Sequence, residues 1–126
     1  GGCIWLPENL PPEAALEQFY RQEAMAFLPP IAKAFAGKMG VSYCRIGITG
    51  AKKRWGSCSG KGSINFSWRL MAAPMAAVEL VAVHELAHLR QLNHSPAFYK
   101  ILASVLPDWR ERKALLENAG RLPQLP

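Results

Sequence analysis

All three histidines of the 126-residue chain fall within positions 84–94. His84, Glu85 and His88 form the pattern HExxH. Residues four apart lie on one face of a helix, so the imidazoles of His84 and His88 can reach a common point. A single divalent ion about 2.0–2.1 Å from each nitrogen would satisfy that geometry. The spacing therefore predicts a metal site with these two histidines as ligands.

His94 is the predicted third ligand. The chain must reverse direction after the helix to bring this ring back to the metal, and we expect Asn93 to adopt the left-handed conformation that such a turn needs. Three nitrogen ligands with an open fourth position are typical of catalytic rather than structural zinc sites. We expect one Zn²⁺, although other divalent transition metals can bind the same ligands.

Glu85 is the candidate catalytic residue. It carries a charge inside an otherwise apolar segment, where a carboxylate without a partner is costly. Beside the first ligand, it can hold and deprotonate a metal-bound water without itself binding the metal. We therefore expect Glu85 to act as the acid/base of a metal-dependent hydrolysis.

The elements before this motif are predicted from periodicity and turn residues. Apolar residues recur at helical spacing over 13–27, and Pro29-Pro30 predicts a kink or break, with a second helix from Pro30 to Lys38 closed by Gly40. Residues 41–49 read as a strand and 50–62 as a loop. Residues 63–68 alternate, which predicts a half-buried strand with Ile64, Phe66 and Trp68 on one face.

The elements after the sheet are predicted to be helices. The segment from Pro74 to about Leu92 carries HExxH and is apolar nearly all round, so it belongs in the centre of the domain. Ser95-Pro96 predicts the start of a helix that runs to about Leu106. Asp108 and Glu111 predict a capping box for a last helix that Gly120 ends. Helices, two strands and further helices, in that order, indicate an α+β fold.

Composition limits the choice of partner and compartment. Lysine and arginine outnumber aspartate and glutamate 15 to 9, and six basic residues fall in an acid-free stretch between Arg45 and Arg69. This charge suits a soluble basic protein and equally an acidic partner such as nucleic acid or a nucleotide. No apolar stretch is long enough to predict a membrane span. Three cysteines without a CxxC pair favour a reducing, cytoplasmic location.

Several sequence blocks together resemble one known family. RWGSC at 54–58, INFSWRL at 64–70 and HELAHL with the following NHS are similar, in this order, to the YgjP-like metallopeptidase domain, which is related to the SprT-like and WLM zincins. The resemblance covers about residues 13–120. It implies a minimal zincin-like fold with N-terminal helices, a small sheet, a central HExxH helix and C-terminal helices. It also implies His84, His88 and His94 as ligands and Glu85 as acid/base. We expect a polypeptide substrate, with a nucleotide as the alternative.

The resemblance also bears on the extent of the domain. Typical members carry a further N-terminal β-rich region, and this chain opens on Gly1-Gly2 rather than Met. We expect residues 1–12 to be a flexible leader and 13–122 to be one domain, the C-terminal domain of a longer protein. The metzincins share the histidine spacing, but Gln91 replaces their glycine and no methionine follows Met75.

Three functions stay open at this point. The first is hydrolysis of peptide bonds, with Arg54, Arg69 and Tyr99 as candidate substrate contacts, although the arginines also suit loop anchoring and Tyr99 suits packing. The second is a metal-dependent nucleotide pyrophosphatase, with the basic segment holding phosphates. The third is a basic, nucleic-acid-associated module in which zinc holds the shape. The oligomeric state is not predicted.

Overall fold

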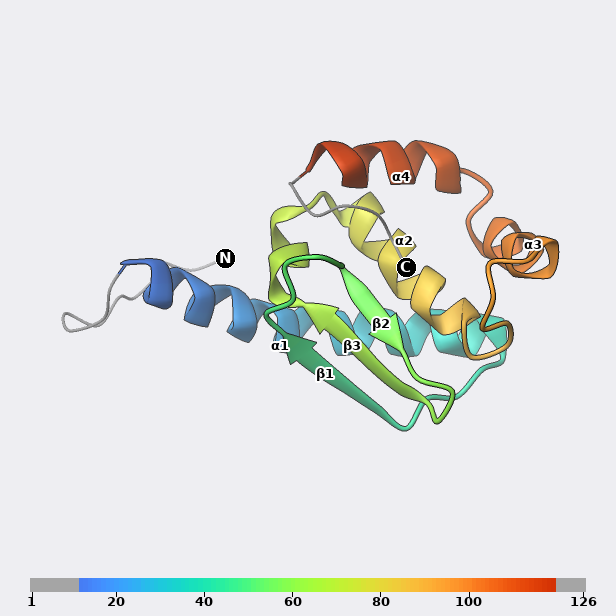
Figure 1. The fold of residues 1–126 in the computed structure, drawn as a ribbon, viewed down its shortest axis with the longest axis horizontal. Coiled ribbons are helices and arrows are strands. Elements are labelled where there is room, and N and C mark those ends of the chain that lie inside the picture. Colours follow the sequence, from blue (N-terminus) through green and yellow to red (C-terminus); the bar gives the residue numbers. More distant parts are fainter. Residues whose placement is uncertain (1–11, 120–126) are drawn as a thin grey trace.

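The computed structural model describes residues 12–119, which form an α+β fold (Figure 1). This class was the predicted one and is confirmed. Pro12, expected in a leader, already belongs to the first helix, and the rest of the predicted leader lies outside the described residues. In chain order the elements are α1 (Pro12–Met39), β1 (Arg45–Thr49), β2 (Gly56–Cys58), β3 (Ser63–Ser67), the 3-10 helix η1 (Trp68–Ala72), α2 (Met75–Ala87), α3 (Pro96–Val105) and α4 (Trp109–Asn118).

Where a kink or break was predicted at Pro29-Pro30, no break occurs, because α1 is one continuous helix. The two prolines deprive the carbonyls of Met25 and Ala26 of their helical donors. Both of these residues are exposed, so water can replace the lost bonds. On the opposite side, buried residues recur across the prolines and hold both halves against the body: Ala24, Leu28, Ala32, Ala36 and Met39. Packing therefore overrides the local preference for a break.

The end of α1 was predicted correctly. Gly40 has a φ of 67°, in the left-handed region that glycine enters without a steric cost. The Val41 amide donates to the Ala36 carbonyl at 3.1 Å, the bond that closes a glycine-ended helix. The chain then turns toward the sheet.

The sheet has the order β1-β3-β2, with β1 parallel and β2 antiparallel to β3. β1 begins at Arg45, later than predicted. β3 ends at Ser67, one residue earlier than predicted, because Trp68 begins η1. The predicted loop contains β2, a three-residue strand whose glycine and serine residues give no alternating apolar signal. Ile64 and Phe66 are fully buried on the inner face of β3, as predicted.

α2 is the central helix of the fold. Ten of its thirteen residues are buried, which confirms the central position expected from its apolar composition. It ends at Ala87 rather than near Leu92, because a turn over residues 88–90 follows. No residue other than glycine has a positive φ in residues 12–119, so the turn forms without a left-handed Asn93.

The two C-terminal helices begin differently. The Ser95 hydroxyl accepts a hydrogen bond from the Phe98 amide at 3.4 Å, which confirms the predicted cap of α3. Asp108 does not cap α4, because its carboxylate accepts a bond from the Arg112 side chain at 2.9 Å instead. The predicted capping box is therefore wrong. Gly120, the predicted end of this helix, lies outside the described residues.

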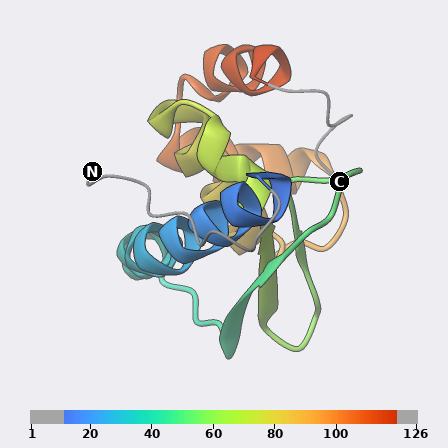
Figure 2. The same cartoon turned by 90° about the vertical axis from the view of Figure 1, so that its left-hand side faces the viewer.

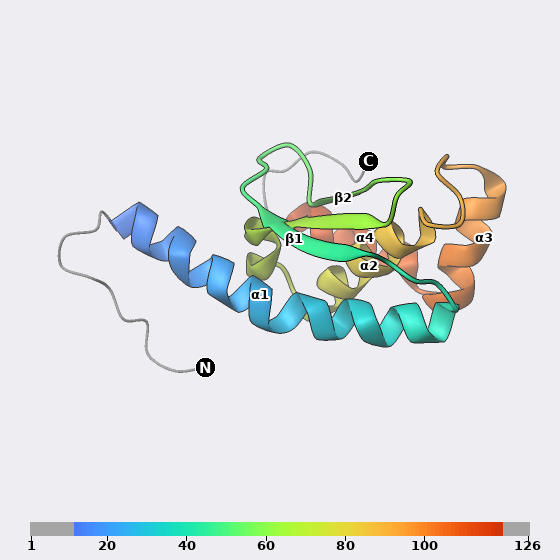
Figure 3. The same cartoon turned by 90° about the horizontal axis from the view of Figure 1, so that it is seen from below.

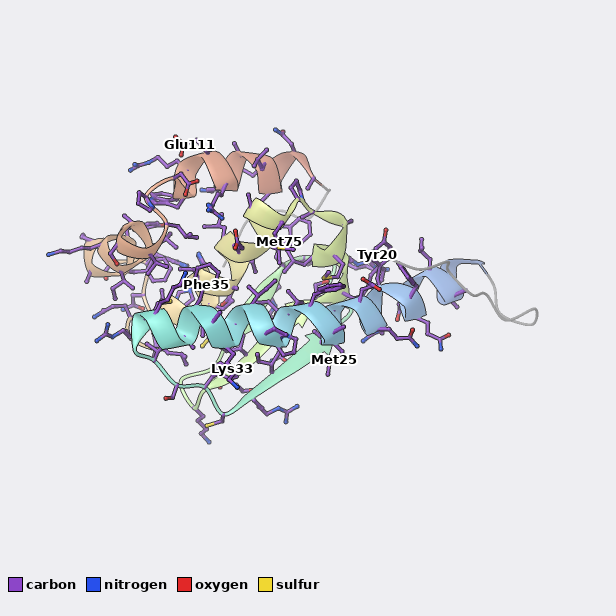
Figure 4. The ribbon with its side chains drawn as sticks, turned by 180° about the vertical axis from the view of Figure 1, so that it is seen from behind. Tyr20, Met25, Lys33, Phe35, Met75 and Glu111 are labelled. Atoms are coloured by element: carbon purple, nitrogen blue, oxygen red, sulfur yellow. The ribbon has the colours of Figure 1, made fainter. Side chains whose placement is uncertain are left out.

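The helices lie on one side of the sheet, and α1 runs along its whole length (Figures 2 and 3). The first turns of α1 extend beyond the body of the molecule (Figure 3). Tyr20 projects from α1 toward η1 and stacks on Trp68 with the ring centroids 6.0 Å apart, whereas Met25 projects from the other side (Figure 4). Between residues 12 and 119, no helix has both the length and the apolar character needed to cross a membrane.

Candidate metal centre

The end of α2 and the turn after it bring the three histidines together. The Nε2 atoms of His84 and His88 are 3.3 Å apart, and the Nε2 atoms of His84 and His94 are also 3.3 Å apart. His84 and His88 are buried, whereas His94 is exposed. One ligand atom from each ring therefore converges on a single point, which is open to solvent on the His94 side.

Backbone groups in the turn orient these rings. His88 Nδ1 lies 3.1 Å from the Gln91 carbonyl oxygen. A carbonyl only accepts, so Nδ1 carries the hydrogen and Nε2 of the neutral ring keeps its lone pair for a cation. The Gln91 amide in turn donates to the Ala87 carbonyl at 3.0 Å, which fixes the turn. The Ser95 cap then sets the direction of the chain just beyond His94.

Phe98 supports the whole cluster from α3. Its ring centroid lies 5.0 Å from that of His84, 4.6 Å from that of His88 and 5.0 Å from that of His94. The side chain is fully buried. Sequence analysis missed this residue, because no local pattern shows that α3 packs against the histidines.

Glu85 lies in the core beside the histidines. Its side chain is fully buried, and within the described chain neither carboxylate oxygen has a hydrogen-bond partner. Burial raises the pKa of this carboxyl to about 8, and the positive charge of Arg54 opposes the rise. Burial raises the pKa of the Cys58 thiol on β2 to about 11, and the negative charge of Glu85 contributes a smaller part of this rise. Glu85 therefore faces β2.

The residues present fit a metal ion. Tetrahedral bonds of about 2.0–2.1 Å hold neighbouring nitrogens roughly 3.3 Å apart, and Nε2 of His84 lies 3.3 Å from Nε2 of both His88 and His94. Neutral imidazole nitrogens are common ligands of zinc and of other divalent transition metals. A nearby cation would also offset the cost of burying the Glu85 carboxylate, which has no other partner in the described residues.

The other predicted site residues are placed differently. Arg54 is exposed in the loop before β2, and its charge reaches Glu85. Tyr99 is 39% exposed, with its ring centroid 6.3 Å from that of His94. Arg69 instead stacks on Trp68 at 4.3 Å, next to α1. The structure thus places Tyr99 near His94, leaves Arg54 within electrostatic reach of Glu85 and gives Arg69 a contact within the fold.

A small α+β fold, with HExxH at the end of its central helix and a third histidine from the next turn, is an arrangement typical of metal-dependent hydrolases. Family comparison makes this assignment more specific. The chain belongs to the YgjP-like metallopeptidase domain family, whose profile matches residues 8–119. The resemblance found in the sequence blocks is confirmed.

Two known proteins are similar to the chain. UTP pyrophosphatase of Escherichia coli (strain K12) is 30% identical over 105 residues, which are 79% of this chain and 63% of that protein. The chain therefore spans less than two thirds of the length of this relative. The crystal structure of the metallopeptidase zymogen of Pyrococcus abyssi abylysin shares the fold, with a TM-score of 0.71. That match covers 79% of this chain and 100% of the other, at 18% sequence identity.

Proposed function

We propose that the chain is a zinc-dependent peptidase in which Glu85 transfers the proton. One observation carries this proposal: three imidazole nitrogens converge beside a buried carboxylate that has no hydrogen-bond partner in the described residues. Burial of a carboxylate without a hydrogen-bond partner costs free energy. The family description, which names a metallopeptidase domain, supports the same class of reaction.

His84, His88 and His94 are the proposed ligands. Zn²⁺ held there would polarise the scissile carbonyl and lower the pKa of a bound water toward about 7. Glu85 accepts the proton of the attacking water and later returns it to the leaving amine nitrogen. Burial raises the pKa of Glu85, and the positive charge of a bound zinc ion would lower it again, so the carboxylate could accept a proton near neutral pH and return it.

The proposed polypeptide substrate lies along β2. Within the described sheet this strand pairs only with β3, so its other edge offers backbone groups to an extended peptide. Arg54 stands next to the start of β2 and is placed to hold an acidic group of the substrate. Tyr99 stands beside His94, where its exposed ring can contact a substrate side chain.

Replacement of Glu85 by Gln tests the proton-transfer role. We expect Glu85→Gln to keep its fold and its zinc content but to lose about 10²–10⁴-fold in kcat, because the amide cannot accept the proton. Zinc content is measured by mass spectrometry and turnover with a denatured, fluorescently labelled protein. Glu111→Gln, at an exposed position of α4, is the matched control and should retain full activity.

Retention of wild-type turnover by the zinc-loaded Glu85→Gln variant would disprove the assignment of Glu85. A Glu85→Gln variant that has lost its zinc would instead show that the carboxylate supports metal binding. Parallel measurements on the Glu111→Gln control separate both results from a general effect of removing one negative charge.

A second candidate function is nucleotide pyrophosphatase activity. Lys52, Lys53 and Arg54 are consecutive, exposed cations shortly before β2, and the charge of Arg54 reaches Glu85. Ser67 fixes both ends of this loop, because its hydroxyl donates to the Ala51 carbonyl at 2.9 Å and its amide donates to the Trp55 carbonyl at 2.8 Å. The relative from Escherichia coli is named a UTP pyrophosphatase. A cationic loop of this kind suits a triphosphate.

Parallel assays separate the two functions. Zinc-loaded protein is incubated with nucleoside triphosphates and, separately, with a denatured protein, and release of pyrophosphate or of new amino termini is measured. Peptide-bond cleavage alone supports the peptidase. Release of pyrophosphate supports the nucleotide pyrophosphatase, provided that Glu85→Gln and a Lys52→Ala/Lys53→Ala variant both abolish it.

A further inference from the structure

Gly56 lies in direct contact with the proposed acid/base. It is the first residue of β2, is buried and pairs with Phe66 of β3, so it is on the inner face of the sheet that α2 covers. A Cβ atom built on Gly56 would lie 3.2 Å from Cγ and 3.2 Å from Oε2 of Glu85. It would also lie 3.0 Å from the Asn65 carbonyl oxygen. A side chain at this position would thus displace one of these neighbours.

The glycine is required for space and not for its backbone conformation. In residues 12–119, the glycines with positive φ are Gly40 and Gly62. The backbone of Gly56 is therefore one that alanine can adopt. Whatever alanine does at this position comes from its methyl group and from the atoms that the methyl group meets.

Packing is what holds the Glu85 carboxylate in place. A carboxylate is usually fixed by hydrogen bonds to its oxygens, but neither oxygen of Glu85 has such a bond in the described structure. Its position therefore depends on the surfaces that enclose it. The bare backbone of Gly56 forms one of these surfaces, directly against Cγ and Oε2.

We propose that Gly56 is a positioning residue, and that its missing side chain sets the place of the Glu85 carboxylate beneath β2. The catalytic consequence rests on the proposed function, whereas the steric contact does not. A methyl group at position 56 moves the carboxylate away from β2 by a few tenths of an ångström or more. Proton transfer depends steeply on such distances.

Kinetic measurements on Gly56→Ala test the catalytic consequence. We expect kcat to fall by roughly 10–100-fold, with the KM and the zinc affinity unchanged, because the methyl group reaches Glu85 and not the histidines. Gly60→Ala is the matched control in the same β2–β3 hairpin. A Cβ on Gly60 would make a single ordinary contact, 3.9 Å from Leu92 Cδ1, so this variant should keep its kcat.

A stability cycle tests the contact without any activity assay. Gly56→Ala is measured in the wild-type background and in the Glu85→Ala background, in the absence of metal. We expect a drop in Tm of about 3–5 °C in the first background, the size that corresponds to about 1 kcal/mol for a domain of this length. In the second background the drop should be less than half as large, because the methyl group then enters the space that the Glu85 side chain has left.

Two outcomes would overturn the proposal. An equal drop in Tm in both backgrounds, or failure of Gly56→Ala to fold in both, would mean that the Asn65 carbonyl alone requires glycine. An unchanged kcat for Gly56→Ala beside an active wild type would mean that the carboxylate tolerates the displacement. If the wild type hydrolyses no substrate, the proposed function fails, and the stability cycle still decides whether Gly56 positions Glu85.

Discussion

Phe98 joins the three imidazoles into one rigid unit at the scale of single residues. Ring contacts to His84, His88 and His94 restrict how far each ring can rotate. Side chains that orient metal ligands without touching the metal typically change metal affinity 10–100-fold when they are replaced. The contacts of Phe98 are apolar rather than hydrogen-bonded, so the same effect is expected toward the lower end of this range.

Phe98→Leu is therefore expected to weaken zinc binding by about tenfold while costing about 1 kcal/mol of stability. Leucine fills most of the same volume but leaves the histidine rings without a flat surface. Competition with a zinc-binding dye measures the affinity. Phe35→Leu, on the partly buried side of α1, is the control, with a similar cost in stability and no change in zinc affinity. Equal zinc affinity in both variants would contradict this role of Phe98.

The ligand set could be predicted from the sequence, because it follows from spacing along one helix and one turn. The contacts of Phe98 and Gly56 could not. Both depend on how α3 and β2 pack against α2, and no local pattern encodes a contact between elements. Gly56 stands in a segment whose glycine and serine residues predict only a loop.

At the scale of elements, α1 stays helical through two prolines because its buried stripe continues past them. Pro30 is exposed and Pro29 is partly exposed, so the fold tolerates the two prolines but does not require them. The sequence predicted a kink or break because backbone preference is visible locally, whereas the packing of Leu28 and Ala36 against the core is visible only in the fold.

Pro30→Ala should accordingly stabilise the protein. The new amide can donate to the carbonyl of Ala26, and part of this gain is offset by greater freedom of the unfolded chain. We expect the free energy of unfolding to rise by on the order of 1–2 kcal/mol, as measured by urea denaturation. A decrease would show that the packing of α1 needs a bend at the prolines.

Arg112 attaches α4 to α2. It donates to Glu79 at 2.8 Å, to the Ala76 carbonyl at 3.1 Å and to Asp108 at 2.9 Å. The hydrogen bond from Arg112 is the main cause that lowers the pKa of Asp108 below its usual value of 3.8. A carboxyl pKa that is lower in the folded than in the unfolded protein stabilises the fold at a pH above the unfolded pKa. This stabilisation is lost as the pH falls through the pKa of the folded state.

Asp108→Asn should therefore lower the Tm at pH 7, where the wild-type carboxylate is charged, and have no effect once the pH is well below 3.8. Asp108 is exposed, so the difference is small and decreases with added salt. Thermal unfolding between pH 2.5 and pH 7 is compared for the two proteins. A gap in Tm that persists at the acid end would assign the effect to packing instead of charge.

At the scale of the whole molecule, stability and the proposed metal site are coupled. The unfolded chain does not hold the three imidazoles together, so an ion that binds the folded state stabilises it. Zinc at about 100 times its Kd contributes about 2.7 kcal/mol, which corresponds to a Tm shift on the order of 10 °C. We expect EDTA to remove this shift in the wild type.

His94→Ala is the comparison for this measurement. It retains the two helix ligands but loses the third, so its Tm should respond much less to zinc and to EDTA. Because His94 is exposed, its replacement does not disturb the core. Wild-type protein whose Tm is the same with zinc and with EDTA would contradict metal binding at the histidine cluster.

The central position of β3 fixes the order in which the sheet can assemble. β2 and β3 adjoin in sequence, and hairpins of this kind form in about 1–10 μs. In the described sheet β1 pairs with β3 alone, across the whole of β2, so we expect it to dock after the hairpin has formed. We expect interactions of β1 to be absent from the folding transition state, and weakening β1 should speed unfolding while leaving the refolding rate unchanged.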